Sequence, residues 1–199
     1  DGVKRPTQLL SVDTSESSGY RFNFDNVKKW ISLAKKNGAE MFEWTHFFSQ
    51  WGVKNALRIY RNNNDENSLL WDPDTSAVSD TYRRFLAQFL PEFHRFLINE
   101  DLLDKSLFHV SDEPHGDEHL ANYRAARSML KELAPWMKVA DALSDIKYGI
   151  EGLTDIPIPS VSAASEFAKA KIPAWTYYCC GPRGAYLNRF VDTPLSKIR

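Results

Sequence analysis

The chain has little cysteine. Its only two cysteines, Cys179 and Cys180, are neighbours in a sequence of 199 residues. A disulfide between adjacent residues is strained and neither cysteine has a distant partner, so a disulfide-stapled scaffold is excluded. No Cys-x-x-Cys spacing and no spaced histidine accompanies the pair, so we expect no metal ion there.

Long apolar runs and an excess of one charge are also absent. No run approaches the roughly 20 apolar residues that cross a bilayer, so we expect no membrane span. The polar opening, 1–6, predicts no signal peptide. The net charge is −1, from 25 basic and 26 acidic residues, which favours neither nucleic acid nor an anionic membrane as partner. We expect a soluble chain, either cytoplasmic or secreted.

Nucleotide-binding glycine motifs are missing as well. The nine glycines form no Gly-x-Gly-x-x-Gly and no Walker loop, which argues against a doubly wound nucleotide-binding fold. We therefore expect no cofactor.

What the sequence does contain is an alternation of helical and extended patterns. Apolar residues at helical spacing predict helices, and short apolar runs between them predict strands. Helices are predicted at 24–38, 79–99, 117–135 and 162–171, with Ser79 or Asp80 as an N-cap and Pro91 kinking or dividing the second helix. Strands are predicted at 8–12, 39–44, 106–110, 137–143, 155–159 and 173–180.

This alternation is typical of a parallel α/β sheet, and we predict a single domain over 1–199 with a (β/α)8 TIM-barrel-like fold. About five or six strands are visible, whereas a closed barrel needs eight. We therefore expect an incomplete barrel. The segment 52–78 is predicted to be a long loop between a strand and a helix, where barrels keep binding residues.

In such a barrel the active site lies at the carboxyl ends of the strands. The residues that follow the predicted strands are carboxylates, one histidine and several aromatics, a composition suited to a carbohydrate site. They are Thr45, His46, Trp51, Asp112, Glu113, Asp141, Asp145, Trp175, Tyr177 and Tyr178.

The adjacent acids Asp112 and Glu113 suggest a mechanism. Most glycosidases place two carboxylates on opposite sides of the scissile bond, which neighbours on one strand end cannot easily do. The pair suits substrate-assisted hydrolysis, in which the sugar's own 2-acetamido group attacks the anomeric carbon. Both acids can face inward only if the chain leaves regular strand geometry, because strand neighbours point to opposite faces. The alternative is that Asp112 caps the following helix and Glu113 is solvated.

The histidines also have two interpretations each. His46 is either a ligand-site residue or a structural one, and His109 is expected to line the barrel. His115 and His119 are close in sequence to acids, but their hydrophilic surroundings favour solvated residues over metal ligands.

Five segments in order resemble a known family. They are THFFSQWG (45–52), FHVSDEPHGDEHLANYRAA (108–126), VADALSD (139–145), DIPIP (155–159) and WTYYCCGPRGAYLNRF (175–190). Together, from about residue 8 onward, they resemble the catalytic barrel of glycoside hydrolase family 123 and a large bacterial group of related glycosidase-like barrels whose function is unknown.

The resemblance implies a bacterial, exo-acting, retaining β-N-acetylgalactosaminidase or hexosaminidase with a glycan or glycoconjugate substrate. Asp112 would stabilise the acetamido group and Glu113 would be the acid/base. His46, Trp51, Asp141, Tyr177 and Tyr178 would bind substrate. Two alternatives remain open: a glycosidase of the same fold with another sugar specificity, and a non-catalytic carbohydrate-binding protein.

Members of the family are longer, with an N-terminal β-sandwich and further barrel strands. By comparison the first and last barrel strands are expected to be missing here, which would leave exposed sheet edges. We expect the chain by itself to be marginally stable or inactive, or to fold only with a partner.

Overall fold

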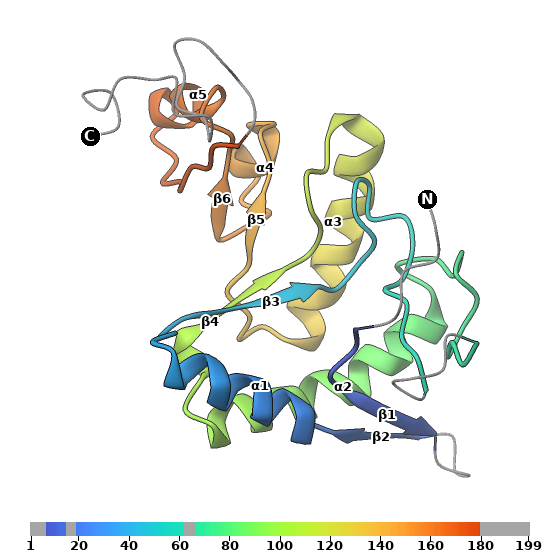
Figure 1. Ribbon diagram of the computed structural model, residues 1–199. Coiled ribbons are helices and arrows are strands. Elements are labelled where there is room, and N and C mark those ends of the chain that lie inside the picture. The colour runs from blue at the N-terminus through green and yellow to red at the C-terminus, as the bar shows by residue number, and fades with distance from the viewer. Residues whose placement is uncertain (1–6, 15–18, 62–66, 180–199) are drawn as a thin grey trace.

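The computed structural model describes residues 7–14, 19–61 and 67–179 (Figure 1). Cys180 and the rest of the last motif, 181–190, lie outside the described residues. The elements are β1 (Ser11–Thr14), β2 (Tyr20–Asn23), α1 (Asp25–Lys36), β3 (Phe42–His46), α2 (Asp80–Asn99), η1 (Leu103–Lys105), β4 (Ser106–His109), α3 (Gly116–Leu133), β5 (Ala140–Ala142), α4 (Lys147–Ile150), β6 (Ile156–Ile158) and α5 (Ala164–Lys169). The predicted alternation of helices and strands is therefore present from α1 to α5.

A parallel run of strands follows the order of the sequence. β3 pairs with β4 and β5 pairs with β6, both in parallel. Single parallel bridges, Phe108 to Val139 and Ser160 to Tyr177, join β4 to β5 and β6 to the next extended segment. Among the described residues these pairings do not close into a ring, and β3 pairs with β4 alone. Closure into a barrel thus stays a prediction.

The first strand differs from its prediction. The expected strand at 8–12 is replaced by β1, which forms an antiparallel hairpin with β2, with Val12 opposite Phe22. Periodicity alone cannot distinguish a hairpin strand from a barrel strand, because the partner is chosen by packing. Here Tyr20 and Phe22 of β2 pack edge-on against Phe85 of α2.

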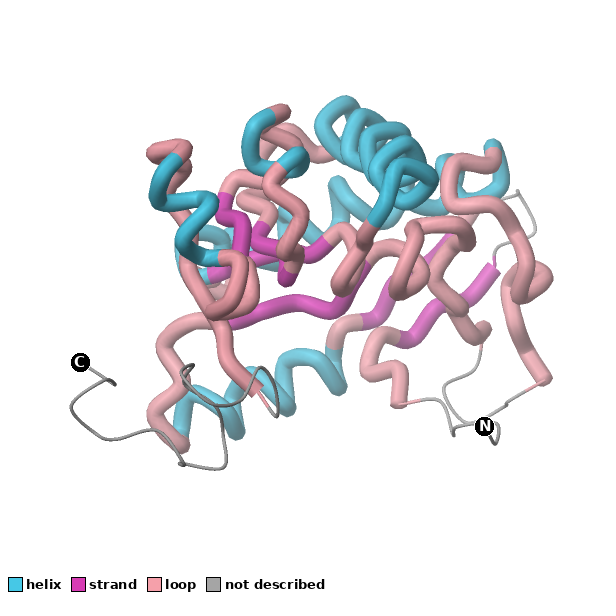
Figure 2. Tube along the Cα trace, turned by 90° about the horizontal axis from the view of Figure 1, so that it is seen from above, coloured by secondary structure: helices cyan, strands magenta, loops and turns pink. Residues whose placement is uncertain are grey.

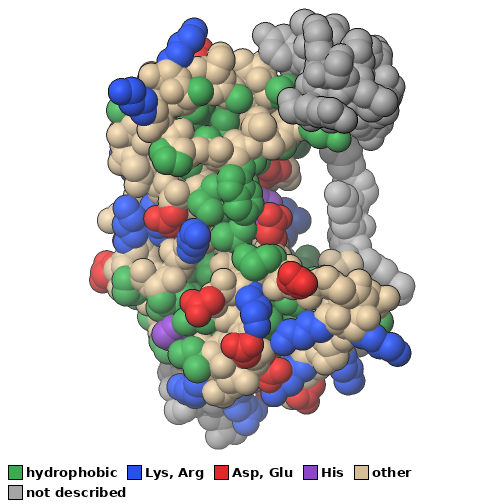
Figure 3. Space-filling view, turned by 90° about the vertical axis from the view of Figure 1, so that its left-hand side faces the viewer, with side chains coloured by type: hydrophobic (Ala, Val, Ile, Leu, Met, Phe, Trp, Pro, Cys, Tyr) green, Lys and Arg blue, Asp and Glu red, His purple; other side chains and the backbone are tan. Residues whose placement is uncertain are grey.

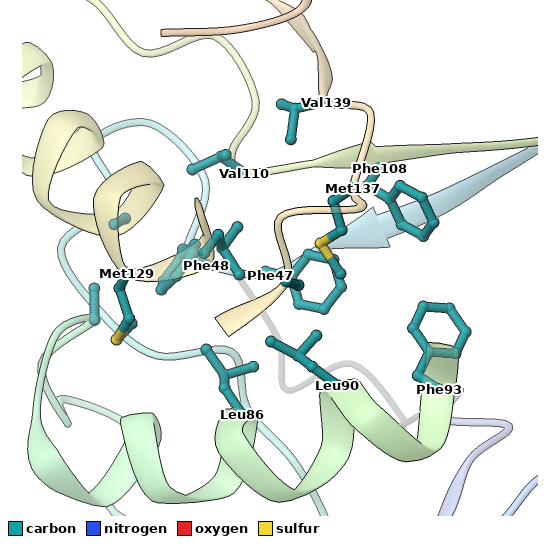
Figure 4. Close-up of a cluster of buried hydrophobic side chains, with 14 of the residues drawn as sticks. Phe47, Phe48, Leu86, Leu90, Phe93, Phe108, Val110, Met129, Met137 and Val139 are labelled. Atoms are coloured by element: carbon teal, nitrogen blue, oxygen red, sulfur yellow. The ribbon is translucent and has the colours of Figure 1, made fainter. Parts of the chain in front are cut away.

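The helices flank the strands (Figure 2). The buried hydrophobic residues of the core come from both the helices and the strands. α2 supplies much of this core through a stripe of phenylalanines and leucines that faces β3 and β4 (Figure 4). Phe93 is central, with its ring 4.9 Å from Trp44 and 6.0 Å from Phe108, centroid to centroid. α2 begins where predicted, because the hydroxyl of its N-cap Ser79 accepts the amide of Tyr82 at 3.3 Å.

Pro91 is predicted to kink or divide this helix; the division is wrong, and the kink stays a prediction. α2 runs unbroken from Asp80 to Asn99 with Pro91 inside it. A proline leaves the carbonyl four residues earlier, that of Ala87, without its helical partner. Both Pro91 and Ala87 lie on the exposed side of the helix, where water can satisfy this carbonyl.

The two faces of the parallel strands differ in character. Phe42 and Trp44 of β3 point to the helices, whereas Glu43 and Thr45, which alternate with them along the strand, are exposed. This alternation places polar side chains on the face away from α2. In the part of the chain that the structure describes, no helix combines the length and apolar character needed to span a membrane.

Candidate functional site

The carboxyl ends of the parallel strands meet at one edge, as they must when neighbouring strands run the same way. Backbone hydrogen bonds continue beyond the strand ends: the amide of Phe47 donates to the carbonyl of His109 at 3.0 Å, and that of Glu113 to the carbonyl of Ala142 at 2.9 Å. The segments after β3, β4 and β5 are thereby tied side by side.

The acid pair lies at this edge. β4 ends at His109, and Glu113 has a φ of 45°, in the left-handed region that side chains with a Cβ adopt rarely. The chain therefore leaves regular strand geometry at the acids, as the sequence predicts. Asp112 is half-buried and Glu113 is exposed, so both carboxylates are accessible from solvent. Strained backbone of this kind gathers at functional sites.

Each carboxylate is held by one side chain from elsewhere in the fold. The side-chain amide of Gln50 donates to Asp112 Oδ2 at 2.6 Å, and the hydroxyl of Tyr177 donates to Glu113 Oε1 at 2.5 Å. Burial and the Glu113 carboxylate raise the pKa of Tyr177, which keeps its phenol protonated as a donor. The structure therefore brings Tyr177 to the acid pair, and it adds Gln50, which the sequence analysis missed although it lies in the segment 45–52.

Asp141 occupies a different place from the one predicted. Its side chain is fully buried, and it accepts the amide of Val110 at 3.1 Å, the hydroxyl of Tyr123 at 2.5 Å, and a contact from His109 Nδ1 at 3.2 Å. A carboxylate enclosed in this way has no surface left for a sugar. The structure thus corrects the prediction that Asp141 binds substrate directly: it supports His109 instead.

His46 and His109 lie beside each other at the ends of β3 and β4, with ring centroids 5.3 Å apart. Burial, followed by the charge of His109, lowers the pKa of His46. Burial also opposes the charged form of His109, but the hydrogen bond and charge of Asp141, with the charges of Glu43 and Asp112, outweigh it and raise its pKa. Relative to a free imidazole, the surroundings thus favour the neutral form of His46 and the charged form of His109.

The two remaining predicted aromatics are exposed. Trp51 is 60% exposed, and its backbone amide donates to the carbonyl of Asp112 at 3.1 Å, so its backbone is tied to the acid loop. Tyr178 is 51% exposed and follows Tyr177 in the chain. Exposed rings of this kind can stack on sugar faces, but only Trp51 is tied to the acids by a hydrogen bond.

The start of α3 closes one side of the site. The amide of His115 donates to His119 Nδ1 at 3.1 Å, and His115 Nδ1 lies 3.2 Å from the carbonyl of Glu113. The side-chain amide of Asn122 donates to the carbonyl of Gly52 at 2.9 Å. These histidines hold the acid loop and are not simply solvated. Within residues 7–14, 19–61 and 67–179, no group of three His, Cys, Asp or Glu side chains is placed to hold a metal ion.

A cavity of about 510 Å³ adjoins the site. Its walls come from β3, α2 and the segments 7–10 and 57–60, and Glu43, Thr45 and His46 form a polar part of its lining. Asp112, Glu113 and Tyr177 do not line it. The acid pair is therefore placed by the strand-end geometry, outside this cavity, and His46 is the strand-end histidine that lines it.

Comparisons with known proteins identify a family and a similar fold. The model of the family described as "Glycoside hydrolase 123, catalytic domain" matches residues 1–199. Among solved structures, a family 123 glycoside hydrolase from Clostridium perfringens, reported for "glycolipid glycan hydrolysis", matches with a TM-score of 0.58 and 14% identity. The match covers 85% of this chain but 31% of that one, so this chain spans less than a third of the relative. No protein with a curated description matches.

Proposed function

This chain belongs to glycoside hydrolase family 123, and we propose that it carries the acid pair of an exo-acting, retaining β-N-acetylhexosaminidase, with β-N-acetylgalactosaminides as substrates. One observation carries the proposal: Asp112 and Glu113 are adjacent at the end of β4, yet each is held separately, by Gln50 and by Tyr177. The natural substrate class we propose is the glycan of a glycoconjugate, such as a glycolipid.

The geometry suits a reaction in which the substrate supplies its own nucleophile. Two neighbouring carboxyls lie too close in the chain to stand on opposite faces of a sugar, as the usual two-carboxylate mechanisms require. In the proposed reaction the carbonyl oxygen of the 2-acetamido group attacks the anomeric carbon, and the bond to the leaving oxygen breaks. An oxazolinium ion forms, and water then opens it with net retention.

The two acids would have separate tasks. Asp112 accepts the acetamido N–H and stabilises the positive charge that develops on that group; the bond from Gln50 to Oδ2 leaves Oδ1 for this contact. Glu113 gives its proton to the leaving oxygen and then takes one from the attacking water. Glu113 is exposed, so it can reach both.

The direct test is hydrolysis of an aryl β-N-acetylgalactosaminide by the full-length protein, beside the matching β-galactoside. We expect cleavage of the acetamido sugar alone, and strong inhibition by a thiazoline that mimics the oxazolinium ion. Glu113→Gln and Asp112→Asn should each lower kcat by roughly 10²- to 10⁴-fold, the usual contribution of a positioned acid or base.

Glu118→Gln is the matched control, because Glu118 is also an exposed glutamate next to the acid loop, in the first turn of α3. It should retain wild-type kcat. Cleavage of both sugars without thiazoline inhibition would replace the proposal with a glycosidase of other specificity. Folded wild-type protein that binds sugars and cleaves neither would point to a carbohydrate-binding role.

A further inference from the structure

Glu43 and His109 face each other across β3 and β4 without a direct hydrogen bond. Glu43 Oε2 and His109 Nε2 are 3.9 Å apart, and the Glu43 side chain is 61% exposed. The register of the two strands shifts between Glu43 and His46, which brings His109 opposite His46 while leaving its ring within reach of Glu43. No described residue, His109 included, lies at hydrogen-bond distance from the Glu43 carboxylate.

The His109 ring is fixed from behind. Its Nδ1 lies 3.2 Å from Asp141 Oδ1, and that buried carboxylate is itself held by the amide of Val110 and the hydroxyl of Tyr123. A carboxylate at Nδ1 requires the proton on Nδ1, so Nε2 is the nitrogen directed toward Glu43. The raised pKa of His109 favours a proton on Nε2 as well, which makes this nitrogen a donor.

One oxygen atom placed to the side of the line between Glu43 Oε2 and His109 Nε2 could lie at hydrogen-bond distance from both. Hydrogen bonds between nitrogen or oxygen atoms are about 2.7–3.2 Å long, so 3.9 Å is too long for one and suits two that share a single oxygen. The shared oxygen would accept from His109 Nε2–H and donate to Glu43 Oε2. A hydroxyl does both. An anion would be repelled by Glu43, and a cation by protonated His109.

We propose that Glu43 and His109 bind one hydroxyl of the terminal sugar, that of C3, C4 or C6, and thereby determine sugar specificity. The inference rests on the proposed function, because it takes the sugar to be the one that Asp112 and Glu113 process. Asp112 follows His109 by three residues and its charge acts on the His109 ring, so the Glu43–His109 pair and the acid pair border one site. Glu43 also lines the adjoining cavity.

Binding of free N-acetylgalactosamine and its 3-, 4- and 6-deoxy analogues to the full-length protein, measured by calorimetry, tests this site. Wild-type protein should bind one of the three analogues roughly 10- to 100-fold more weakly than the parent, because two charged groups then lose their shared partner. Glu43→Gln should lower the affinity for the parent sugar by a similar factor and leave the affinity for that one analogue unchanged. The variant should therefore no longer prefer the parent sugar.

His109→Gln should have the same signature, although it can unfold the protein by removing one of the hydrogen-bond partners of the buried Asp141. Glu43 is exposed, so Glu43→Gln keeps the inference testable in that event. Glu40→Gln is the matched control: Glu40 is exposed three residues earlier in the same segment and should retain the full preference.

The inference is overturned if Glu43→Gln weakens all four sugars equally or none of them, or if wild-type protein does not distinguish them; the gap would then hold only a water. Hydrolysis by the same wild-type sample reports on the proposed function separately. Glu43→Gln could abolish the preference while the wild-type protein cleaves no acetamido sugar. That result would support the hydroxyl site and contradict the proposed reaction.

Discussion

Tyr177 and Gln50 act at the residue scale by fixing the direction of the two acids. A carboxylate on a strained, exposed loop has several orientations open to it, and only some present an oxygen to the leaving group. The 2.5 Å hydrogen bond from Tyr177 to Glu113 Oε1 leaves Oε2 for the proton transfer that we propose. Tyr177 is itself anchored, because its amide donates to the carbonyl of Pro159 at 3.2 Å.

We predict that Tyr177→Phe lowers kcat roughly 10- to 100-fold, since a hydrogen bond to a charged group contributes about 1.5–3 kcal/mol. The loss should be large for substrates whose leaving group needs a proton and small for a dinitrophenyl glycoside, whose leaving group does not. Kinetics with both substrates measure this difference.

Tyr20→Phe, which removes a hydroxyl from the distant β2 hairpin, should leave both rates unchanged. An equal loss with both leaving groups would contradict a role for Tyr177 in positioning the acid and indicate a general effect on folding.

At the scale of elements, the loop after β3 is held against the start of α3 by backbone that only glycine adopts easily. Gly52 has a φ of 145°, and Trp51 and Val53 on either side also have positive φ values, 54° and 56°. A Cβ on Gly52 would lie 2.8 Å from His119 Nε2, far inside a normal contact. The loop can therefore approach α3 closely because residue 52 has no side chain.

We predict that Gly52→Ala destabilises the protein by about 1–3 kcal/mol and lowers kcat/KM, because it strains the backbone and displaces His119, which holds the acid loop through His115. Denaturant unfolding and steady-state kinetics measure the two effects.

Gly38→Ala is the matched control. Gly38 also has a positive φ, 90°, but an added Cβ there would meet nothing within 4 Å. Gly38→Ala should lower the free energy of unfolding through backbone strain alone and leave kcat/KM unchanged. Equal losses of kcat/KM in both variants would mean that the close approach to His119 plays no part in function.

At the scale of the whole molecule, the parallel order from β3 to the segment at Tyr177 is the order of neighbouring strands in a (β/α)8 barrel, and we propose that the described strands are part of one. β3 has an unpaired edge within the described residues, next to a largely apolar cavity. Hydrophobic side chains also gather across the middle of one face of the molecule, between acidic and basic ones (Figure 3). Unpaired edges and apolar surface are normally covered in a stable domain.

We therefore predict that the 199-residue chain by itself unfolds over a broad range of denaturant, binds a hydrophobic dye, and cleaves substrate poorly. A longer protein that carries this chain should unfold cooperatively and be active, because further strands would cover the β3 edge. Comparison of the two by unfolding and hydrolysis is the measurement. A sharp unfolding transition and full activity of the 199-residue chain alone would contradict this proposal.

The sequence by itself determined the features that depend on near neighbours. Helical periodicity and the Ser79 cap predicted α2, and the alternation of patterns predicted the order of elements from α1 to α5 except for the short helices η1 and α4. The acid pair was visible because its members are adjacent, and Pro114 directly after them agreed with the end of the strand. Such signals span a few residues, so they are present in the chain before it folds.

Only the tertiary structure decided which distant side chains meet. Gln50 reaches Asp112 across 62 residues of chain, and Tyr177 reaches Glu113 across 64. The burial of Asp141, the antiparallel hairpin of β1, and the 3.9 Å gap between Glu43 and His109 depend likewise on how strands and helices pack. The physical reason is that register and burial are set by the summed packing of the whole core, which no local pattern contains.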